Sequence, residues 1–351
     1  MTPKQILFFI PLIQDLKEKG HEVLNTSRKY LEVELLASLK GLDLTFVGRH
    51  GGESLIEKLK ASSERSLHLS DYVKKLGIDY AISFSSPECA RVAFGMGVKH
   101  FCISDSPHSE KVCRLTIPLS DILLTPSIIP SSAWSEYGIN KDRIVMYNAL
   151  DPAVWLKRRS NESANKEDYG LTVSKKTISI RLEESQASYL LHSDKSYSKK
   201  LLDSLIANFP DCEIFVLGRY SPQIEAIRKS YGSKVNIATH AVDGAGLLSV
   251  SDVFIGMGGT MTAEASLLGV PSISAFQGAQ LYTEQFLIKE GLLVRLKSIN
   301  QIINMVGELL QNKNHKKNLQ EHAKKVLENM EDPVSAVIKT LEKSAFEDRI
   351  L

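Results

Sequence analysis

Short apolar segments alternate with longer segments of helical spacing along both halves of this 351-residue chain. Such alternation is typical of parallel βαβ units, because a crossover helix is needed to return the chain to the start of the next strand. The strands of such a sheet are covered by helices on both faces and are therefore apolar on both sides. The pattern predicts an α/β fold.

The start of the chain lacks the strand with which an α/β domain normally opens. Thr2 and Gln5 have capping-box spacing and Pro3 suits a first helical position, so a helix is expected up to about Lys19. We therefore expect the first strand of the N-terminal domain to be missing, which would uncover the edges of its neighbours. After this helix, the first half predicts strands at residues 21–24, 42–47, 80–84, 100–104, 121–125 and 143–147, and helices at 27–40, 53–76 and 87–95.

A polar stretch at residues 156–171 interrupts the alternation and predicts a domain boundary. The tail at 299–346 is helical in pattern, with breaks near Asn314 and at Pro333. We expect an N-terminal domain at 1–155, a C-terminal domain at 172–332, and a helix at 333–351 that packs back on the first domain. The second half predicts strands at 177–180, 213–217, 234–237, 252–255 and 272–275, and helices at 195–208, 222–231, 245–250 and 260–268.

Charge and composition exclude several classes of protein. The formal net charge is only +2 and the basic residues are dispersed, which argues against a nucleic-acid partner. No apolar run approaches the roughly 18 residues that cross a bilayer, so no transmembrane segment is expected, while peripheral membrane association stays open. The four cysteines form no CxxC pair and the histidines lack metal-binding spacing, which predicts reduced thiols, a cytoplasmic location, no metal site and no cofactor.

A glycine-rich turn between a buried strand and a helix is the strongest local signal. Gly258, Gly259 and Thr260 follow the strand at 252–255. The unpaired amides of a helix start donate hydrogen bonds to phosphate, and glycines let the backbone approach the phosphate closely. Glu264, one turn later, is a candidate acceptor for ribose hydroxyls. The alternative is an ordinary turn, with Thr260 as helix cap and Glu264 facing solvent.

Two further loops of the second half are candidates for the same ligand, since ligands bind beyond the carboxyl ends of parallel strands. Gln280, in the loop after residues 272–275, is a candidate for hydrogen bonds to sugar hydroxyls. Arg181 follows the strand at 177–180 and is a candidate phosphate ligand, with Glu183, Glu184 and Ser188 nearby. The alternatives are a solvated glutamine and a surface arginine.

In the first half, one loop concentrates ionisable side chains beyond a strand. Asp105, His108 and Glu110 are candidate general acids or bases, and His108 titrates near neutrality without help. The alternatives are that Asp105 caps the next helix and that Arg114 pairs with Glu110 at helical spacing.

A second loop of the first half carries consecutive glycines. Gly51 and Gly52 follow the strand at 42–47 and precede a helix. They are a candidate anion-binding turn, and the alternative is an ordinary flexible connection.

The segment at residues 258–271 resembles the nucleotide-binding segment of GT-B-fold glycosyltransferases and of UDP-N-acetylglucosamine 2-epimerases. Nearly the whole chain resembles an archaeal family known as domain of unknown function 354. That resemblance rests on residues 2–12, 48–52, 86–91, 104–114, 181–189 and 258–271. In that family a strand normally precedes the segment matching Thr2, Pro3 and Lys4.

The resemblance implies two Rossmann-like domains that face a central cleft. It implies that Glu264 holds the ribose, that the turn at 258–260 lies by the diphosphate, and that Gln280 contacts the donor sugar. Glu110 and Arg114 resemble a segment of the 2-epimerases. The acidic residue that those enzymes carry after the strand matching 80–84 is absent here, where Ser85, Ser86 and Pro87 stand.

These observations favour a metal-independent glycosyltransferase whose substrate is a nucleotide-sugar, of the UDP-sugar class, with an unidentified acceptor. The helix start and Arg181 would stabilise the departing diphosphate, and Asp105, His108 or Glu110 would deprotonate the acceptor. The first alternative is a 2-epimerase-like enzyme, in which those groups move a proton at C2 of the sugar. The second is a non-catalytic nucleotide-sugar-binding protein.

Overall fold

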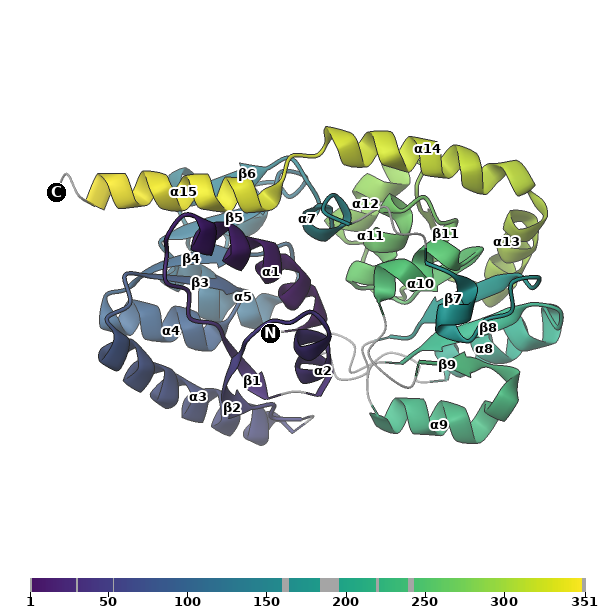
Figure 1. The fold of residues 1–351 in the computed structure, drawn as a ribbon, viewed down its shortest axis with the longest axis horizontal. Coiled ribbons are helices and arrows are strands. Elements are labelled where there is room, and N and C mark those ends of the chain that lie inside the picture. The colour runs from purple at the N-terminus through teal and green to yellow at the C-terminus, as the bar shows by residue number, and fades with distance from the viewer. Residues whose placement is uncertain are drawn as a thin grey trace. The chain divides into compact units, whose positions relative to one another are not determined.

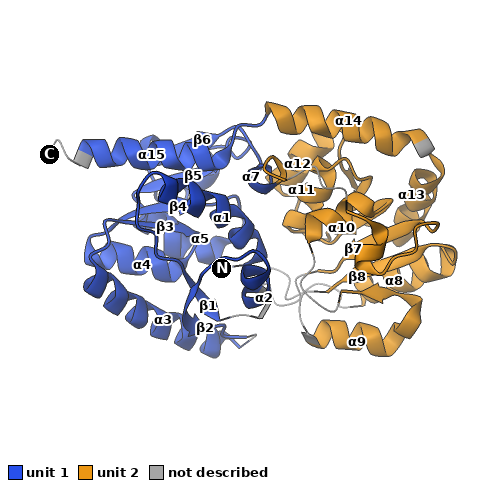
Figure 2. Cartoon of the chain, viewed as in Figure 1, with its two compact units in different colours: residues 1–155, 330–351 blue, residues 156–329 orange. Residues whose placement is uncertain are grey.

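The structure is a computed structural model that describes residues 2–29, 31–52, 54–159, 164–183, 196–218, 221–238 and 243–348. The chain divides into two compact units (Figure 2). Unit 1 comprises Met1–Trp155 and Met330–Leu351, and unit 2 comprises Leu156–Asn329. The C-terminal segment therefore belongs to the same unit as the first half of the chain (Figure 1).

Unit 1 contains two parallel sheets, one of order β1-β2 and one of order β3-β4-β5-β6. Its strands are β1 (Thr26–Lys29), β2 (Thr45–Arg49), β3 (Tyr80–Phe84), β4 (Lys99–Ile103), β5 (Ile122–Pro126) and β6 (Ile144–Tyr147). Its α-helices are α1 (Pro3–Glu18), α2 (Leu31–Leu39), α3 (Leu55–Leu76), α4 (Pro87–Met96), α5 (Glu110–Thr116), α6 (Ser132–Ser135), α7 (Ala153–Leu156, ending one residue into unit 2) and α15 (Pro333–Asp348).

Helix α1 is fixed at its start and along two sides. The Thr2 amide donates to Oε1 of Gln5 over 2.7 Å, which satisfies one of the unpaired donors of the helix start. Ile6 packs with Val33 of α2 in an apolar cluster. Lys19, just after α1, pairs with Glu342 of α15 over 2.8 Å, so the last helix lies against the first.

Unit 2 contains one six-stranded parallel sheet of order β12-β11-β10-β7-β8-β9. Its strands are β7 (Thr177–Arg181), β8 (Glu213–Leu217), β9 (Asn236–Ile237), β10 (Val253–Gly256), β11 (Ser272–Ser274) and β12 (Val294–Arg295). Its α-helices are α8 (Tyr197–Asn208), α9 (Ser221–Tyr231), α10 (Gly244–Val250), α11 (Thr260–Leu267), α12 (Tyr282–Lys289), α13 (Ile299–Gln311) and α14 (Lys313–Asn329).

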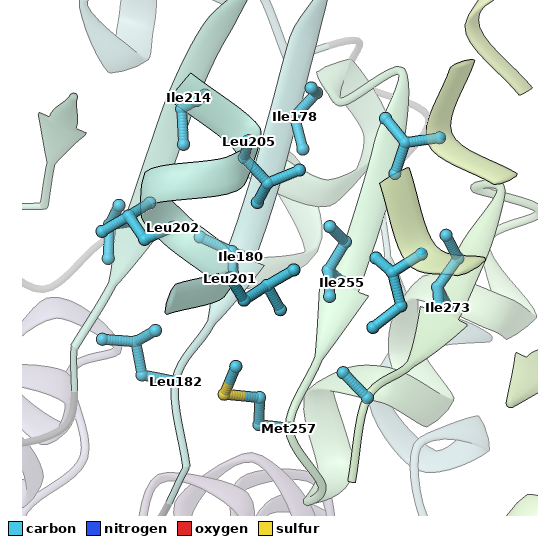
Figure 3. Packing of buried hydrophobic residues seen from close by; sticks show 14 of the residues in the cluster. Ile178, Ile180, Leu182, Leu201, Leu202, Leu205, Ile214, Ile255, Met257 and Ile273 are labelled. Atoms are coloured by element: carbon cyan, nitrogen blue, oxygen red, sulfur yellow. The ribbon is translucent and has the colours of Figure 1, made fainter. Parts of the chain in front are cut away.

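The core of unit 2 follows from the two-residue period of its strands. Ile178 and Ile180 of β7 pack with residues of α8 and α13 in one buried cluster (Figure 3). Phe254 of β10 points away from that cluster and packs with Leu248 and Ala265, from α10 and α11. Both faces of the sheet are thus covered by helices, which is why its strands are apolar on both sides.

The structure corrects two of the expected elements and adds two others. Residues 21–24 form no strand, and the first strand is instead β1, with the polar sequence Thr-Ser-Arg-Lys. Only Ser27 of β1 is buried, so hydropathy gives no strand signal there. The helix expected from residue 27 begins at Leu31. The two-residue strand β12 and the helix α12 were not anticipated, whereas the tail breaks at Asn312, near the expected position, and α15 begins at Pro333 as expected.

Candidate functional site

The order of strands in unit 2 creates a site at one defined point. From β7 the chain continues to β8 on one side of the sheet, and from β10 it continues to β11 on the other side. In open α/β sheets, ligands bind at the carboxyl ends of two neighbouring strands with such diverging connections. Arg181, the last residue of β7, is in register with Gly256, the last residue of β10. The structure therefore brings Arg181 beside the glycine-rich turn, as the sequence predicts. Nη1 of Arg181 also donates to the carbonyl of Gly218 over 2.7 Å.

One buried side chain anchors the glycine-rich turn. Met257 is 3% exposed and belongs to the core cluster, next to Leu182 at the end of the sheet (Figure 3). Its amide donates to the Arg181 carbonyl over 3.0 Å. Gly258 and Gly259 then adopt φ values of +88° and +90°, a conformation that favours glycine. This anchoring sets the position of the backbone amides at the start of α11.

The structure decides two details that the sequence leaves open at this turn. Gly259 is the N-cap of α11, and Thr260 is its first helical residue, so the alternative of Thr260 as cap is wrong. Glu264 is 7% exposed, so the alternative of a solvated Glu264 is wrong as well. Glu264 is therefore buried one turn after the glycine-rich turn, and its role as a ribose ligand stays a prediction.

The loop after β11 is held by groups that the sequence analysis missed. The guanidinium of Arg295 donates to the carbonyls of Phe276, over 3.1 Å, and of Gly278, and lies 3.9 Å from Oε2 of Glu284. Glu284 is buried and accepts a hydrogen bond from Ser274. Gln280, at the end of this loop, is exposed. The sequence signal for Glu284 is its place at the third position of a helix, where its carboxylate accepts from the amide of Leu281 over 3.3 Å.

Part of the predicted site falls on residues that the structure leaves undescribed. Glu184 and Ser188 lie outside the described residues, and so does the segment at 187–189 that supports the family resemblance. Glu183 is described, and it accepts a hydrogen bond from Ser198 over 2.6 Å.

In unit 1, Asp105 is part of a compact ionic cluster. Nζ of Lys4, near the start of α1, lies 2.5 Å from Oδ2 of Asp105 and 2.6 Å from Oδ2 of Asp151. The Tyr147 hydroxyl donates to Oδ1 of Asp151 over 2.6 Å, and the Ser106 hydroxyl donates to Oδ1 of Asp105 over 2.7 Å. Asp105 follows β4, and Tyr147 and Asp151 lie at and beyond the end of β6. The cluster thus joins two strand ends to the first turn of a helix.

Burial and neighbouring charges shift the pKa values of Asp105 and Asp151 in opposite directions. Burial raises the pKa of Asp151 to about 6, against the attraction of Lys4 and with the repulsion of Asp105. Burial also acts to raise the pKa of Asp105, but the charge of Lys4 and hydrogen bonds from Lys4, Ser106 and Asp151 outweigh it and lower the pKa. The Lys4 ammonium stays charged because the two carboxylates outweigh its desolvation and raise its pKa.

The three side chains differ in their access to solvent. Those of Lys4 and Asp105 are 15% and 18% exposed, whereas that of Asp151 is fully buried. Solvent therefore reaches Asp105 but not Asp151 or Tyr147, which are both buried. Paired acids with separated pKa values are typical of acid–base sites. Lys4, Tyr147 and Asp151 were not predicted as site residues, although Asp151, like Asp105, follows the carboxyl end of a strand, where ligands of parallel sheets bind.

The other candidates of the Asp105 loop differ in their relation to this cluster: Glu110 pairs with Arg114, whereas His108 feels the charges of Asp105 and Lys4. Glu110 accepts a hydrogen bond from Nε of Arg114 over 2.8 Å, and both side chains are about two-thirds exposed (64% and 66%). They form the helical pair that the sequence offered as an alternative. His108 is exposed by more than a third, yet partial desolvation lowers the pKa of its imidazole against the attraction of Asp105.

The glycines after β2 lie at the approach to α3. Gly52 has a φ of +65°, and its amide donates to Nδ1 of His50 over 3.1 Å. A Cβ on Gly51 would come within 2.7 Å of the Glu57 carbonyl, so this position requires glycine for packing. An anion-binding role for Gly51 and Gly52 stays a prediction.

The described residues contain neither a metal-binding cluster nor a helix that could span a membrane. No three His, Cys, Asp or Glu side chains among them are grouped in a way that would hold a metal ion. None of the helices within the described ranges combines the length and hydropathy required to cross a membrane.

We expect Asp151 to make the stability of the fold depend on pH. In the folded chain Asp151 keeps its proton up to about pH 6, whereas an unfolded chain releases it near 3.8. The folded state therefore binds more protons between these values, and stability falls as pH rises through them, by about 2–3 kcal/mol from this group. Urea unfolding from about pH 4 to pH 7 measures the decline.

The matched variant for this prediction is Asp151→Asn, which keeps the shape of the side chain and removes its titration. The difference in unfolding free energy between the unmodified chain and the variant should shrink or change sign as pH rises to about 6, and then stay constant. A difference that grows with pH would contradict a raised pKa for Asp151.

Fold and site together define an α/β protein with a GT-B-like fold, as two solved structures show. The UDP-N-acetylglucosamine 2-epimerase of Neisseria meningitidis, bound to UDP-N-acetylglucosamine, has a TM-score of 0.74 at 16% identity, covering 97% of this chain and 96% of that chain. The spinosyn rhamnosyltransferase SpnG, complexed with spinosyn aglycone, has a TM-score of 0.63 at 14% identity, covering 97% of both chains. The predicted fold class is confirmed.

The chain belongs to the family described as "Protein of unknown function (DUF354)", which it matches over residues 2–341. A curated relative, the uncharacterized protein MJ0665 of Methanocaldococcus jannaschii, is 28% identical over 311 residues, which is 86% of this chain and 88% of the relative. The family resemblance inferred from the sequence is therefore confirmed, and the family name assigns no activity.

Proposed function

We propose that this protein is a nucleotide-sugar-dependent glycosyltransferase that acts without a metal ion and takes a UDP-sugar as donor. The observation that carries the proposal is Asp105, a partly exposed carboxylate that Lys4 holds in its charged form at the end of β4. An accessible, ionised carboxylate can act as a general base and remove a proton from an acceptor hydroxyl.

Unit 2 supplies the groups that would bind the donor. The amides at the start of α11 and the Arg181 guanidinium carry positive charge toward the carboxyl ends of β7 and β10, where a diphosphate would bind. Glu264 would accept hydrogen bonds from the ribose, and Gln280 would contact the sugar. The Neisseria meningitidis enzyme of similar fold binds UDP-N-acetylglucosamine, which supports a UDP-sugar as the class to test first.

The proposed step conserves atoms and charge. The acceptor oxygen forms a bond to the anomeric carbon of the donor while the bond from that carbon to the diphosphate oxygen breaks. The acceptor proton passes to Asp105, and the electrons of the broken bond leave with the nucleoside diphosphate. Arg181 and the α11 amides stabilise the charge that grows on that leaving group.

A 2-epimerase-like reaction is the second candidate, favoured by the higher TM-score to the epimerase than to the rhamnosyltransferase. That reaction removes a proton at C2 and returns one to the opposite face, which requires proton-transferring groups on both sides of the sugar. The chain has Ser85, Ser86 and Pro87 after β3, and Glu110 is paired with Arg114 in solvent. These groups fit a transferase, which needs one deprotonation, better than an epimerase, which needs proton transfer on both faces of the sugar.

A thermal-shift experiment tests donor binding. We expect UDP-N-acetylglucosamine or another UDP-sugar to stabilise the chain by about 2.7 kcal/mol at 100 times its Kd, whereas GDP- and CMP-sugars do not. Glu264→Gln should lose most of this shift, measured against its own ligand-free melting temperature. Glu308→Gln, an exposed change on α13, is the matched control and should keep the shift.

Product analysis separates the candidates. A transferase releases nucleoside diphosphate only when an acceptor is present, and a 2-epimerase yields the C2 epimer of the nucleotide-sugar without one. Binding with neither product would indicate the non-catalytic alternative. A shift that Glu264→Gln leaves intact would sink the assignment of the ribose contact.

A further inference from the structure

Helix α3 of unit 1 exposes many apolar side chains. Its inward face is defined by Ala61, Arg65 and Leu69, which are spaced four residues apart and are each no more than 8% exposed. The exposed large apolar side chains of α3 are Leu55, Ile56, Leu59, Leu67, Tyr72 and Leu76. A single exposed apolar side chain is ordinary on a protein surface, whereas several on one helix indicate a binding surface.

Three of these side chains form a stripe on the outward face of α3. At 3.6 residues per turn, Ile56 and Leu67 point in directions about 20° apart, and Leu59 points within about 80° of both. Ile56 points about opposite to the buried Arg65. The three apolar side chains are 57%, 63% and 69% exposed. A helical stripe of this kind normally packs against another element.

Helix α4 extends this surface. The hydroxyl of Ser62 in α3 donates to Oε1 of Glu88 over 2.9 Å, and Leu69 packs with Val92, so α4 lies beside α3 (Figure 1). Phe94 of α4 is 63% exposed. Helix α3 alone is about 33 Å long. That length suits a standard interface, which covers about 800 Å² per partner and is therefore about 30 Å across.

The charges on the outward face of α3 indicate which partner fits it. Lys60 and Asp71 are both exposed and lie about three turns apart on the side of the helix that carries Leu67. An anionic lipid surface would attract Lys60 but repel Asp71. Two antiparallel copies of α3 satisfy both charges, because each Lys60 then faces Asp71 of the second copy. Such a face is complementary to itself, as a two-fold interface requires.

Lys60 also has a partner within its own helix. Its Nζ lies 3.2 Å from Oε1 of Glu57, and both side chains are more than a third exposed. An exposed pair of this kind contributes little and does not neutralise the field of Lys60 toward a second helix.

We propose that the outward face of α3, together with Phe94 of α4, is an interface that binds a second copy of this chain. The two α3 helices pack antiparallel about a two-fold axis near Leu67. The two Leu67 side chains contact each other there, and a Lys60–Asp71 pair lies on either side of them. Apolar packing supplies the affinity, and the charges fix the direction of the helices. This dimer does not depend on the proposed sugar transfer.

Sedimentation equilibrium of the full chain tests the dimer. We expect twice the mass of one chain, which is 39.0 kDa. Leu67→Glu places two like charges at the axis and should raise the Kd of the dimer by about 100-fold or more. Circular dichroism should stay the same, because Leu67 is exposed in the single chain. Val173→Glu, which changes a 64% exposed side chain in unit 2, is the matched control and should leave the Kd unchanged.

Charge reversal tests the direction of the two helices. Lys60→Asp and Asp71→Lys each bring like charges together twice, so either change alone should weaken the dimer by about tenfold or more. The two changes combined restore opposite charges, and the Kd should return to within about threefold of its original value. A double variant that stays as weak as the single variants would overturn the antiparallel pairing.

Three other outcomes would overturn the interface itself. The first is a chain that stays monomeric at about 100 µM, which is beyond the range of a specific dimer of this size. The second is a dimer that Leu67→Glu leaves intact. The third is a monomeric chain that sediments with vesicles of phosphatidylserine and phosphatidylcholine and is released by Leu67→Glu, since this result would assign the face to a membrane.

Discussion

Replacing Asp105 by Asn should lower the turnover of the donor sugar by about 10²- to 10⁴-fold, the usual contribution of a general base. The amide of the variant keeps the shape of the side chain and a contact with Ser106, but it cannot take a proton from an acceptor. The binding groups of unit 2 are unchanged, so the affinity for the nucleotide-sugar should stay within about threefold. Steady-state kinetics and isothermal titration measure the two quantities separately.

Asp142→Asn is the matched control for this prediction. Asp142 is an exposed carboxylate just before β6, and therefore at the opposite end of that strand from Asp151. Its replacement should leave turnover unchanged. If Asp105→Asn loses less than about threefold in turnover while still folded, Asp105 is not the base. A loss of affinity equal to the loss of turnover would assign it to binding instead.

The regular part of the fold could be predicted because its signals are local. The limits of β3 and β8 match the expected strands to the residue, since each is an apolar run with a turn or helix at both ends. β1 was misplaced by several residues because three of its four side chains are not buried, and pairing with β2 rather than hydropathy defines it. β12 has only two residues, which is too short for any period to appear.

The two parts of the candidate site also differ in how far they could be predicted from the sequence. The turn at Gly258 and Gly259 is a local feature, because positive φ values and a helix start leave a mark within a few residues. The cluster around Asp105 depends on Lys4, 101 residues away, and on Asp151 behind it. Only the folded sheet brings these groups together, so the partly exposed Asp105 could be predicted from the sequence, whereas Lys4 and Asp151, which affect its charge, could not.

The largest effect on stability is expected at Gly269, between α11 and β11. Gly269 has a φ of +68°, and a Cβ there would lie within 2.7 Å of the backbone nitrogen of Gln320 in α14. A backbone atom cannot swing aside as a flexible side chain can. Gly269→Ala should therefore cost about 1–2 kcal/mol for the left-handed conformation and a further 1–3 kcal/mol for the forced displacement of α14.

Gly291→Ala separates these two contributions. Gly291 has nearly the same φ, +69°, in the same unit, and no atom within 4 Å of an added Cβ. Its replacement should cost only the conformational part, so urea unfolding followed by circular dichroism should show roughly twice the loss for Gly269→Ala. Equal losses would mean that α14 moves aside at little energetic cost.

If α14 instead stays in place, α11 must shift, and the amides at its start move away from Arg181. Gly269→Ala should then weaken nucleotide-sugar binding as well, whereas Gly291→Ala should not.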